Sequence, residues 1–235
     1  MKAAEIEDFI RAQTALSPAA IVPEIALHLA SEVTPLWHVT EERLKGGDLP
    51  PPYWAFAWPG GQGLARYALD HAEEIKGKRV LDFASGCGIA SIAAMKAGAR
   101  SAIAADIDPL AQAAARLNAA QNGVDIEISG AVDMEKAFAR ADIIFAGDVC
   151  YQQAMSAEVL RWLYLSLAKG VRVLLADPGR AYAPRENLAE IARYEVPTSR
   201  DLEDRDSFGD FTRGIRVPEV LRRLFDRGRG VGKSA

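Results

Sequence analysis

Two carboxylates, each in or at the end of an apolar run, are the residues of this chain best placed to do chemistry. Asp82 lies in Val-Leu-Asp-Phe-Ala-Ser-Gly-Cys-Gly (residues 80–88), and Asp106 ends Ala-Ile-Ala-Ala-Asp, 24 residues after Asp82. A strand, a glycine loop, a helix, a second strand and an acid, in this order, form the nucleoside pocket of a doubly wound α/β sheet. The sequence therefore predicts a nucleoside site at the carboxyl ends of parallel strands.

The glycine loop indicates which nucleoside is bound. A dinucleotide fingerprint needs G-x-G-x-x-G, and Ser91 stands here in place of the third glycine. Asp82 would repel a pyrophosphate but attract an ammonium or a sulfonium, whereas Asp106 suits the ribose of either class. A nicotinamide dinucleotide and a turn that binds nothing are the alternatives. We predict S-adenosylmethionine as the cofactor, bound by Asp82, Ser85, Gly86, Gly88 and Asp106.

Three further positions are candidates for the same cofactor. Trp58 could form a wall at its methionine end, or could only pack the N-terminal extension onto the domain. Gly60 and Gln62 offer amides that suit its carboxylate, or form a turn and a helix start. Asp133 follows the third expected strand, where related folds hold the adenine amino group, and is equally well explained as a surface acid.

Composition restricts the class of protein. The 235 residues are 49% hydrophobic and 26% charged, which is enough for one sizeable core. The net charge of −4 gives no general attraction to nucleic acid or to an anionic membrane, so we expect neither as a partner. Cys87 and Cys150 are too few for a disulfide framework, and His28, His38 and His71 are too scattered to build a metal site with them.

The N-terminus has the wrong character for export. Its acidic residues fit neither a secretory signal nor a transit peptide, and Pro23 and Glu24 interrupt the next apolar run before it could span a membrane. With cysteine usage that fits a reducing compartment, this pattern predicts a cytoplasmic protein.

The periodicity of the chain predicts an α/β domain at 51–203, after a helical N-terminal extension at 1–50 that Pro50-Pro51-Pro52 closes. The extension should contain helices at 3–15 and about 24–32. Alternating elements predict a mostly parallel sheet with right-handed crossovers. The expected strands are 79–83, 101–105, 126–129, 143–146 and 171–176, and the expected helices 63–71, 89–97, 109–117 and 156–168.

A second group of candidate residues follows the fourth expected strand. Asp148 and Tyr151 occur in Gly-Asp-Val-Cys-Tyr, at the edge of the sheet where an acceptor would enter. Asp148 could orient an acceptor, or could only cap the next helix. Asp177-Pro178-Gly179-Arg180 follows the fifth strand, where Arg180 would suit an acidic or carbonyl-rich acceptor loop.

Several motifs together resemble one family, the lysine methyltransferases of the electron transfer flavoprotein β subunit. The resemblance covers about residues 20–200 and depends on Pro-Tyr-Trp-Ala at 52–55, Trp-Pro-Gly-Gly-Gln at 58–62, the 82–88 loop, Asp-Ile-Asp-Pro at 106–109, Gly-Asp-x-x-Tyr at 147–151 and Asp-Pro-Gly-Arg at 177–180. It implies a doubly wound, mostly parallel seven-strand Rossmann-like methyltransferase sheet, with Ile107 as a further cofactor residue. It also implies a protein lysine as acceptor, with the flavoprotein β subunit as partner and Asp148 and Tyr151 as catalytic residues.

Two departures from the family pattern stand out. Ala84 replaces a frequent glycine, which is tolerable where the backbone torsions leave room for a Cβ atom. The family ends in a hairpin with an apolar, tryptophan-containing last strand, which cannot be placed after Glu203. The segment 204–235 is therefore predicted to be partly disordered, with an arginine-rich tail from Arg213 that is solvated or, as the alternative, forms a basic binding patch.

Other functions stay open from the sequence. The Asp-Ile-Asp-Pro segment and the Asn122-Gly123 helix end also resemble ribosomal-protein methyltransferases, and a cofactor-binding partner module without catalysis is a third possibility. Methylation of nucleic acid is disfavoured, because the residues after Asp148 lack the Pro-Pro step that presents an aromatic ring to a flipped base.

Overall fold

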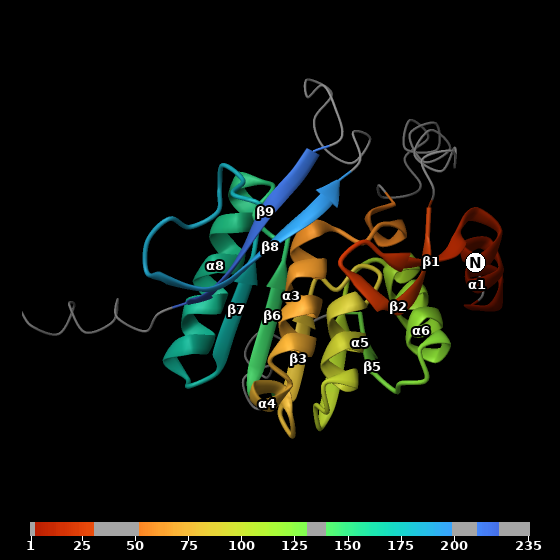
Figure 1. Cartoon of the computed structure of the whole chain (residues 1–235), viewed down its shortest axis with the longest axis horizontal. Coiled ribbons are helices and arrows are strands. Elements are labelled where there is room, and N and C mark those ends of the chain that lie inside the picture. The colour runs from red at the N-terminus through yellow and green to blue at the C-terminus, as the bar shows by residue number, and fades with distance from the viewer. Residues whose placement is uncertain (1–2, 31–51, 131–139, 199–210, 221–235) are drawn as a thin grey trace, which may run out of the picture.

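A computed structural model describes residues 3–30, 52–130, 140–198 and 211–220, which build a central sheet of seven strands (Figure 1). Its order is β5-β4-β3-β6-β7-β9-β8, so the predicted doubly wound, mostly parallel seven-strand sheet is confirmed. The strands are β3 (Arg79–Phe83), β4 (Ser101–Ala105), β5 (Glu127–Ser129), β6 (Ile143–Gly147), β7 (Arg172–Ala176), β8 (Leu188–Thr198) and β9 (Phe211–Val220). The strand order reverses between β3 and β6, which places a ligand crevice at their carboxyl ends.

Alternate residues of the parallel strands face the two helical layers. Val80 and Phe145 pack in one core with α3 (Pro59–Asp70) and α5 (Ile89–Lys96). Their neighbours Leu81 and Ile144 pack in a second core with α8 (Gln153–Ala168). Because helices cover both faces of its parallel part, the strands β4, β6 and β7 read as nearly continuous apolar runs without polar alternation.

Local signals set where the helices begin. The Asp108 side chain accepts a hydrogen bond from Leu110 N at 2.8 Å, and Pro109 then starts α6 (Pro109–Gln121). Helix α3 starts at Pro59, four residues before the predicted start, after the 3-10 turn η1 (Tyr53–Ala55). The short helix α4 (Ala72–Ile75) links α3 to β3.

The N-terminal segment is only partly helical. Helix α1 (Ala3–Gln13) agrees with the prediction, but the helix expected at 24–32 is wrong, because β1 (Ala15–Ala19) and β2 (Val22–Leu29) form an antiparallel hairpin. Ile25 and Leu27, two residues apart, are fully buried. Their spacing is the two-residue period of a strand, which Pro23 obscures.

Two asparagines of α6 hold this hairpin on the domain. Asn118 Oδ1 accepts a hydrogen bond from His28 N at 2.7 Å, and Asn122 Oδ1 accepts one from Ala26 N at 3.1 Å. On its other side, Asn118 Nδ2 donates to Cys87 O in the glycine loop at 2.9 Å. Buried backbone groups of β2 are thereby paired, and the hairpin is connected to the loop after β3.

The end of the described chain corrects a second prediction. Residues 211–220 form β9, which pairs antiparallel with β8 and with β7, so the tail expected to be solvated from Arg213 begins inside the sheet. The closing hairpin of the family is present without a tryptophan in its last strand. Asp133 and the turn at Pro50-Pro51 lie outside the described residues. Within the described part of the chain, no helix is long and apolar enough to cross a membrane.

Candidate functional site

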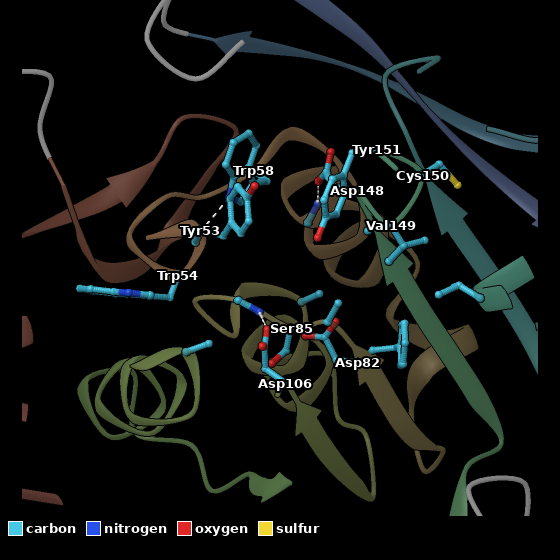
Figure 2. Close-up of a pocket in the computed structure, with 18 of the residues that line it drawn as sticks. Tyr53, Trp54, Trp58, Asp82, Ser85, Asp106, Asp148, Val149, Cys150 and Tyr151 are labelled. Carbon is cyan, nitrogen blue, oxygen red and sulfur yellow. Dashed lines mark hydrogen bonds between the residues drawn. The ribbon is translucent and has the colours of Figure 1, made fainter. Parts of the chain in front are cut away.

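A cavity of about 970 Å³ opens at the carboxyl ends of the parallel strands, where the fold predicts a ligand (Figure 2). In this view Asp82, Ser85 and Asp106 lie at its lower side, and Tyr53, Trp58, Asp148 and Tyr151 at its upper side. We call the part near β3 and β4 the nucleoside half, lined by Trp54, Asp82, Ser85, Gly86, Asp106 and Ile107. The part near β6 and β7 is the acceptor half, lined by Asp148, Tyr151, Met155, Glu158, Arg180 and Tyr182.

Hydrogen bonds to backbone amides fix Asp106 in the nucleoside half. Its Oδ2 accepts from Gly86 N at 2.9 Å, and its Oδ1 accepts from Asp108 N at 3.0 Å. Each carboxylate oxygen has a second lone pair, so the side chain can still accept hydrogen bonds from the two hydroxyls of a ribose. The geometry therefore agrees with the role predicted for Asp106.

Asp82 is held by Ser91, the residue that stands in place of the third glycine of the dinucleotide fingerprint. Its Oδ2 accepts hydrogen bonds from Ser91 N at 3.0 Å and from Ser91 Oγ at 2.9 Å. With only 3% of the residue exposed, burial raises the pKa of Asp82 to about 7, and the two Ser91 hydrogen bonds oppose this rise. A cationic ligand in the nucleoside half would favour the ionised form, which fits the ammonium or sulfonium of S-adenosylmethionine.

Two buried polar atoms test whether the nucleoside half fits a cofactor. Ser85 Oγ and Trp54 Nε1 have no hydrogen-bond partner among the described residues, and both side chains belong to residues that line the cavity. Ile107 is 86% exposed beside them, an unusual position for an isoleucine. The unpaired Ser85 hydroxyl and the bare Ile107 side chain suit a ligand with polar groups and a flat base, so these residues fit an adenosine, whereas the Trp54 ring packs against Phe9.

The glycines of the loop serve different purposes. Gly86 lines the cavity, whereas Gly88 does not. Gly88 has φ +79°, and a Cβ atom there would lie 2.9 Å from Ala115 Cβ, so it allows α5 to pack closely on α6. Ala84 has φ +55°, in the left-handed region, which costs a residue with a Cβ atom roughly 1–2 kcal/mol. Ala84 therefore does not meet the condition under which alanine replaces glycine without a cost.

Aromatic rings line the upper side of the cavity in Figure 2. Trp58 lines the cavity, and its Nε1 donates to Tyr53 O at 2.8 Å. The ring of Tyr53 lies 5.8 Å from that of Trp58 and 5.8 Å from that of Tyr151. We call Tyr53, Trp58 and Tyr151 the aromatic wall. The sequence singled out Trp58 and Tyr151 but not Tyr53, whose only signal was its place in the Pro-Tyr-Trp-Ala motif.

Gln62 does not lie where the sequence predicts. Its side chain is buried away from the cavity, with Oε1 accepting from Ile21 N at 3.3 Å and Nε2 donating to Ala57 O at 2.6 Å. Both polar groups of the amide are thus used to hold the N-terminal hairpin and the segment before α3. We correct its assignment from cofactor binding to this structural role.

Gly60 also lies outside the cavity, and a close approach explains it. A Cβ atom at Gly60 would lie 2.5 Å from Ala176 O and 2.6 Å from Asp148 Oδ2. The first turn of α3 therefore rests directly on the ends of β6 and β7, and only glycine permits this contact. In place of the predicted contact with the cofactor, we assign to Gly60 a role in placing Asp148.

Replacing Gly60 with alanine should therefore destabilise the protein by about 1–3 kcal/mol, the usual cost of overpacking a rigid contact. Thermal or denaturant unfolding would measure the change. Gly61→Ala is the matched control, because its Cβ would meet only Ile89 Cγ2, at 3.3 Å, on a side chain that can move. Equal stability of the two variants would show that α3 can shift away from the strand ends at no cost.

Asp148 is fixed more tightly than any other acid in the acceptor half. Its Oδ2 accepts from Gly61 N at 3.1 Å, its Oδ1 accepts from Arg180 Nη1 at 2.6 Å, and its own N donates to Ala176 O at 2.9 Å. The residue has φ +58°, and 11% of its side chain is exposed. Asp148 thus caps α3, not the helix that follows it. Burial raises the pKa of the Asp148 carboxyl, while the Arg180 charge opposes that rise.

The Arg180 side chain points toward Asp148, contrary to the expectation that it would be available to bind an acidic or carbonyl-rich acceptor loop. Asp177 Oδ1 accepts from Gly179 N at 2.7 Å and from Arg180 N at 2.6 Å, which turns the chain back on itself. The guanidinium then reaches Asp148, and its Nη1 also lies 3.4 Å from Asp177 Oδ2. The Asp-Pro-Gly-Arg turn signalled a loop, but its partner 32 residues earlier could not be foreseen. Elsewhere in the described chain, no group of three His, Cys, Asp or Glu side chains could hold a metal ion.

Known proteins are similar to most of this chain. The family described as Ribosomal protein L11 methyltransferase (PrmA) matches residues 64–150. The electron transfer flavoprotein beta subunit lysine methyltransferase of Rattus norvegicus is 36% identical over 187 residues, which span 77% of this chain and 72% of the rat protein. The Homo sapiens protein of the same name is 34% identical over 209 residues, covering 85% of this chain and 78% of its own.

A solved structure supports the fold independently. A candidate RNA methyltransferase from Pyrococcus horikoshii has a TM-score of 0.52 and 16% identity, over 80% of this chain and 98% of the other. This likeness shows the shared architecture alone. The identity to the rat and human enzymes extends over more than two thirds of both partners. The chain therefore belongs to the family of electron transfer flavoprotein β subunit lysine methyltransferases, enzymes that use S-adenosylmethionine.

Proposed function

We propose that this enzyme methylates lysine side chains of the electron transfer flavoprotein β subunit. The observation that carries the proposal is one continuous cavity with a nucleoside half at Asp106 and an acceptor half at Asp148. A methyl donor in the first half and an amine in the second would share a single space. The names of the rat and human relatives supply the protein that presents the lysine.

The nucleoside half would hold the cofactor by its two ends. Asp106 would accept hydrogen bonds from the ribose hydroxyls, Ile107 would pack on the adenine, and Asp82 would attract the cationic methionine end. Ser85 Oγ would supply a polar contact, since it lacks a partner among the described residues. Asp133 stays a prediction for the adenine amino group. When bound, S-adenosylmethionine supplies a methyl group on a sulfonium, and the lysine nitrogen lone pair forms the new C–N bond as the C–S pair returns to sulfur.

The acceptor half must favour a neutral amine. Lysine has a pKa of about 10.4, so only about one side chain in a thousand is neutral near pH 7.4. Packing of an entering lysine against the rings of the aromatic wall would remove water from its amine and so lower its pKa. Asp148 can accept a hydrogen bond from the amine and direct its lone pair across the cavity. The proton lost before transfer leaves to solvent.

Transfer of radioactive methyl from S-adenosylmethionine to purified flavoprotein tests the function, with mass spectrometry locating the modified lysines. Ribosomal protein L11 is the competing substrate, because the PrmA family matches residues 64–150. That segment contains every residue of the nucleoside half except Trp54, and methyltransferases with different acceptors can share these residues. Label on the ribosomal protein alone would assign the acceptor half to that substrate. The expected cytoplasmic location stays a prediction.

Cofactor affinity should depend on pH through Asp82. Its carboxyl has a raised pKa of about 7, so protonation below pH 7 removes the charge that attracts the cationic ligand. Affinity should fall up to about tenfold per pH unit below 7 and level off above it, since only the ionised form binds well. Titration calorimetry between pH 5.5 and 7.5 measures this, with the ligand α-amine still mostly charged.

Asp82→Asn should bind more weakly and lose this pH dependence. Asp125→Asn, at an exposed position, is the matched control and should keep the wild-type curve. A wild-type affinity that stays flat over this range would show that Asp82 is not the group to which binding is linked.

A further inference from the structure

The pairing of Arg180 with Asp148 is produced by several independent features of the fold. The carboxylate of Asp177 holds the turn, Gly179 adopts φ +92°, and the Arg180 side chain, only 20% exposed, crosses to the end of β6. On the other side, the α3 amide of Gly61 holds the second oxygen of Asp148. Segments after β6 and after β7, together with the start of α3, thus all contribute to one charge pair on the cavity.

The charged groups around Asp148 determine what it can do to an incoming amine. Arg180 and Asp177 face it from the loop after β7, and Tyr151 and the buried Cys150 thiol follow it after β6. Glu158 lines the same half from α8, and Asp82 and Asp106 lie across the cavity. Arg180 is the cation in direct contact with Asp148, and a guanidinium keeps its proton at any pH the protein meets.

A carboxylate without such a partner would favour the wrong form of the substrate. An opposite charge within hydrogen-bond distance stabilises an ammonium, which has no lone pair and cannot accept a methyl group. When Arg180 pairs with Asp148, the attraction of that carboxylate for a second cation is weakened, even though Asp177 shares the same guanidinium. The remaining lone pairs of Asp148 can still accept a hydrogen bond from a neutral amine.

We propose that Arg180 is a positioning residue that makes the acceptor half select the neutral lysine amine, by keeping Asp148 ionised but already paired. The inference rests on the proposed function, because it requires a lysine to enter beside Asp148. It assigns to Arg180 a role in the ionisation of the substrate and no contact with the transferred methyl group. Loss of its charge should therefore change the pH at which the enzyme works more than how tightly it holds its protein substrate.

The test is the pH dependence of kcat and KM for the flavoprotein with wild type, Arg180→Gln and Arg180→Lys. Arg180→Gln leaves the Asp148 carboxylate without its cation. Either the substrate lysine then keeps its proton, because the free carboxylate stabilises the ammonium, or Asp148 becomes protonated. Both changes move the acid limb of the kcat profile to higher pH. A shift of about one unit would lower kcat about tenfold near pH 7, with recovery at alkaline pH. KM for the flavoprotein should not rise. Arg180→Lys keeps the charge and should restore most of the wild-type profile.

Two controls separate this role from a structural one. Arg161→Gln removes an exposed arginine of α8 and should leave both rate and profile unchanged. Carbon NMR of protein labelled at its aspartate carboxyls, with Asp148→Asn used for assignment, should show Asp148 titrating at higher pH in Arg180→Gln. Calorimetry should show unchanged cofactor affinity.

Three outcomes would separate this role of Arg180 from the proposed function of the enzyme. An active wild type whose kcat profile coincides with that of Arg180→Gln would overturn the inference and leave the proposed function standing. A loss of cofactor affinity in proportion to kcat would also overturn it, since Arg180 would then only hold the cavity in shape. A wild type that moves no methyl group to flavoprotein lysines would remove the proposed function and the inference with it.

Discussion

Replacing Asp148 with asparagine is expected to lower the rate of lysine methylation on the order of a hundredfold, within the usual range for a positioned acid–base group. The amide oxygen can still accept from Gly61 N, so the cap on α3 is retained. The charge that partners Arg180 is lost, and with it the acceptor that directs the amine. Single-turnover rates with labelled cofactor would measure the effect, and calorimetry should find cofactor affinity almost unchanged.

The pH profile of this variant gives a second check. Asp148→Asn leaves the Arg180 guanidinium without its carboxylate partner. The positive charge of Arg180 then favours the neutral form of the substrate amine, so the acid limb of the kcat profile should stay in place or move to lower pH. Arg180→Gln is expected to move that limb the other way. Tyr151→Phe should have a smaller effect, because it removes only a hydroxyl from the aromatic wall. An equal loss of cofactor affinity and rate in Asp148→Asn would place Asp148 in the cofactor site.

Replacing Asp106 with alanine should weaken binding of S-adenosylmethionine at least about a hundredfold. The carboxylate would accept two hydrogen bonds from ribose, each worth roughly 1.5–3 kcal/mol when one partner is charged. The same oxygens hold Gly86 N and Asp108 N, so the loop loses its fixed shape as well. Calorimetric titration would measure the loss, with Asp106→Asn expected to fall between the two proteins.

Unchanged affinity in Asp106→Ala would mean that the nucleoside does not lie at the end of β4. Thermal unfolding of the same variant is the necessary companion measurement. A large loss of stability would attribute the weaker binding to an altered loop and not to missing contacts with the ribose.

The nucleoside half could be predicted from sequence because its signals are local. An apolar strand, glycines and an acid within 27 residues define β3, the loop and β4. The structure that each of these segments prefers is compatible with that of the adjoining segments. Pro109 likewise marked the start of α6. In these segments the backbone preferences and the tertiary structure favour the same conformation, so the pattern and the fold coincide.

The errors fall where a distant partner decides the outcome. Gln62 is used by the hairpin turn at Ile21, and Arg180 by Asp148, and neither pairing leaves a mark in the nearby sequence. Strand β9 carries arginines and Pro218, which argue against a strand, yet it pairs along the whole of β8. Tertiary hydrogen bonding outweighed intrinsic preference in each case.

Asn118 and Asn122 of α6 make the N-terminal hairpin a structural support of the cofactor site. Asn118 holds the backbone of β2 with its oxygen and the carbonyl of Cys87 with its nitrogen, so the hairpin acts as a brace for the loop that receives the cofactor. Segment 64–150, although it carries the family signature, would lose this brace if isolated. The side-chain oxygens of Asn118 and Asn122 would lose their partners on β2 and be exposed to water. We therefore expect the smallest working unit of this enzyme to begin with its first strands, well before the residues that carry the family match.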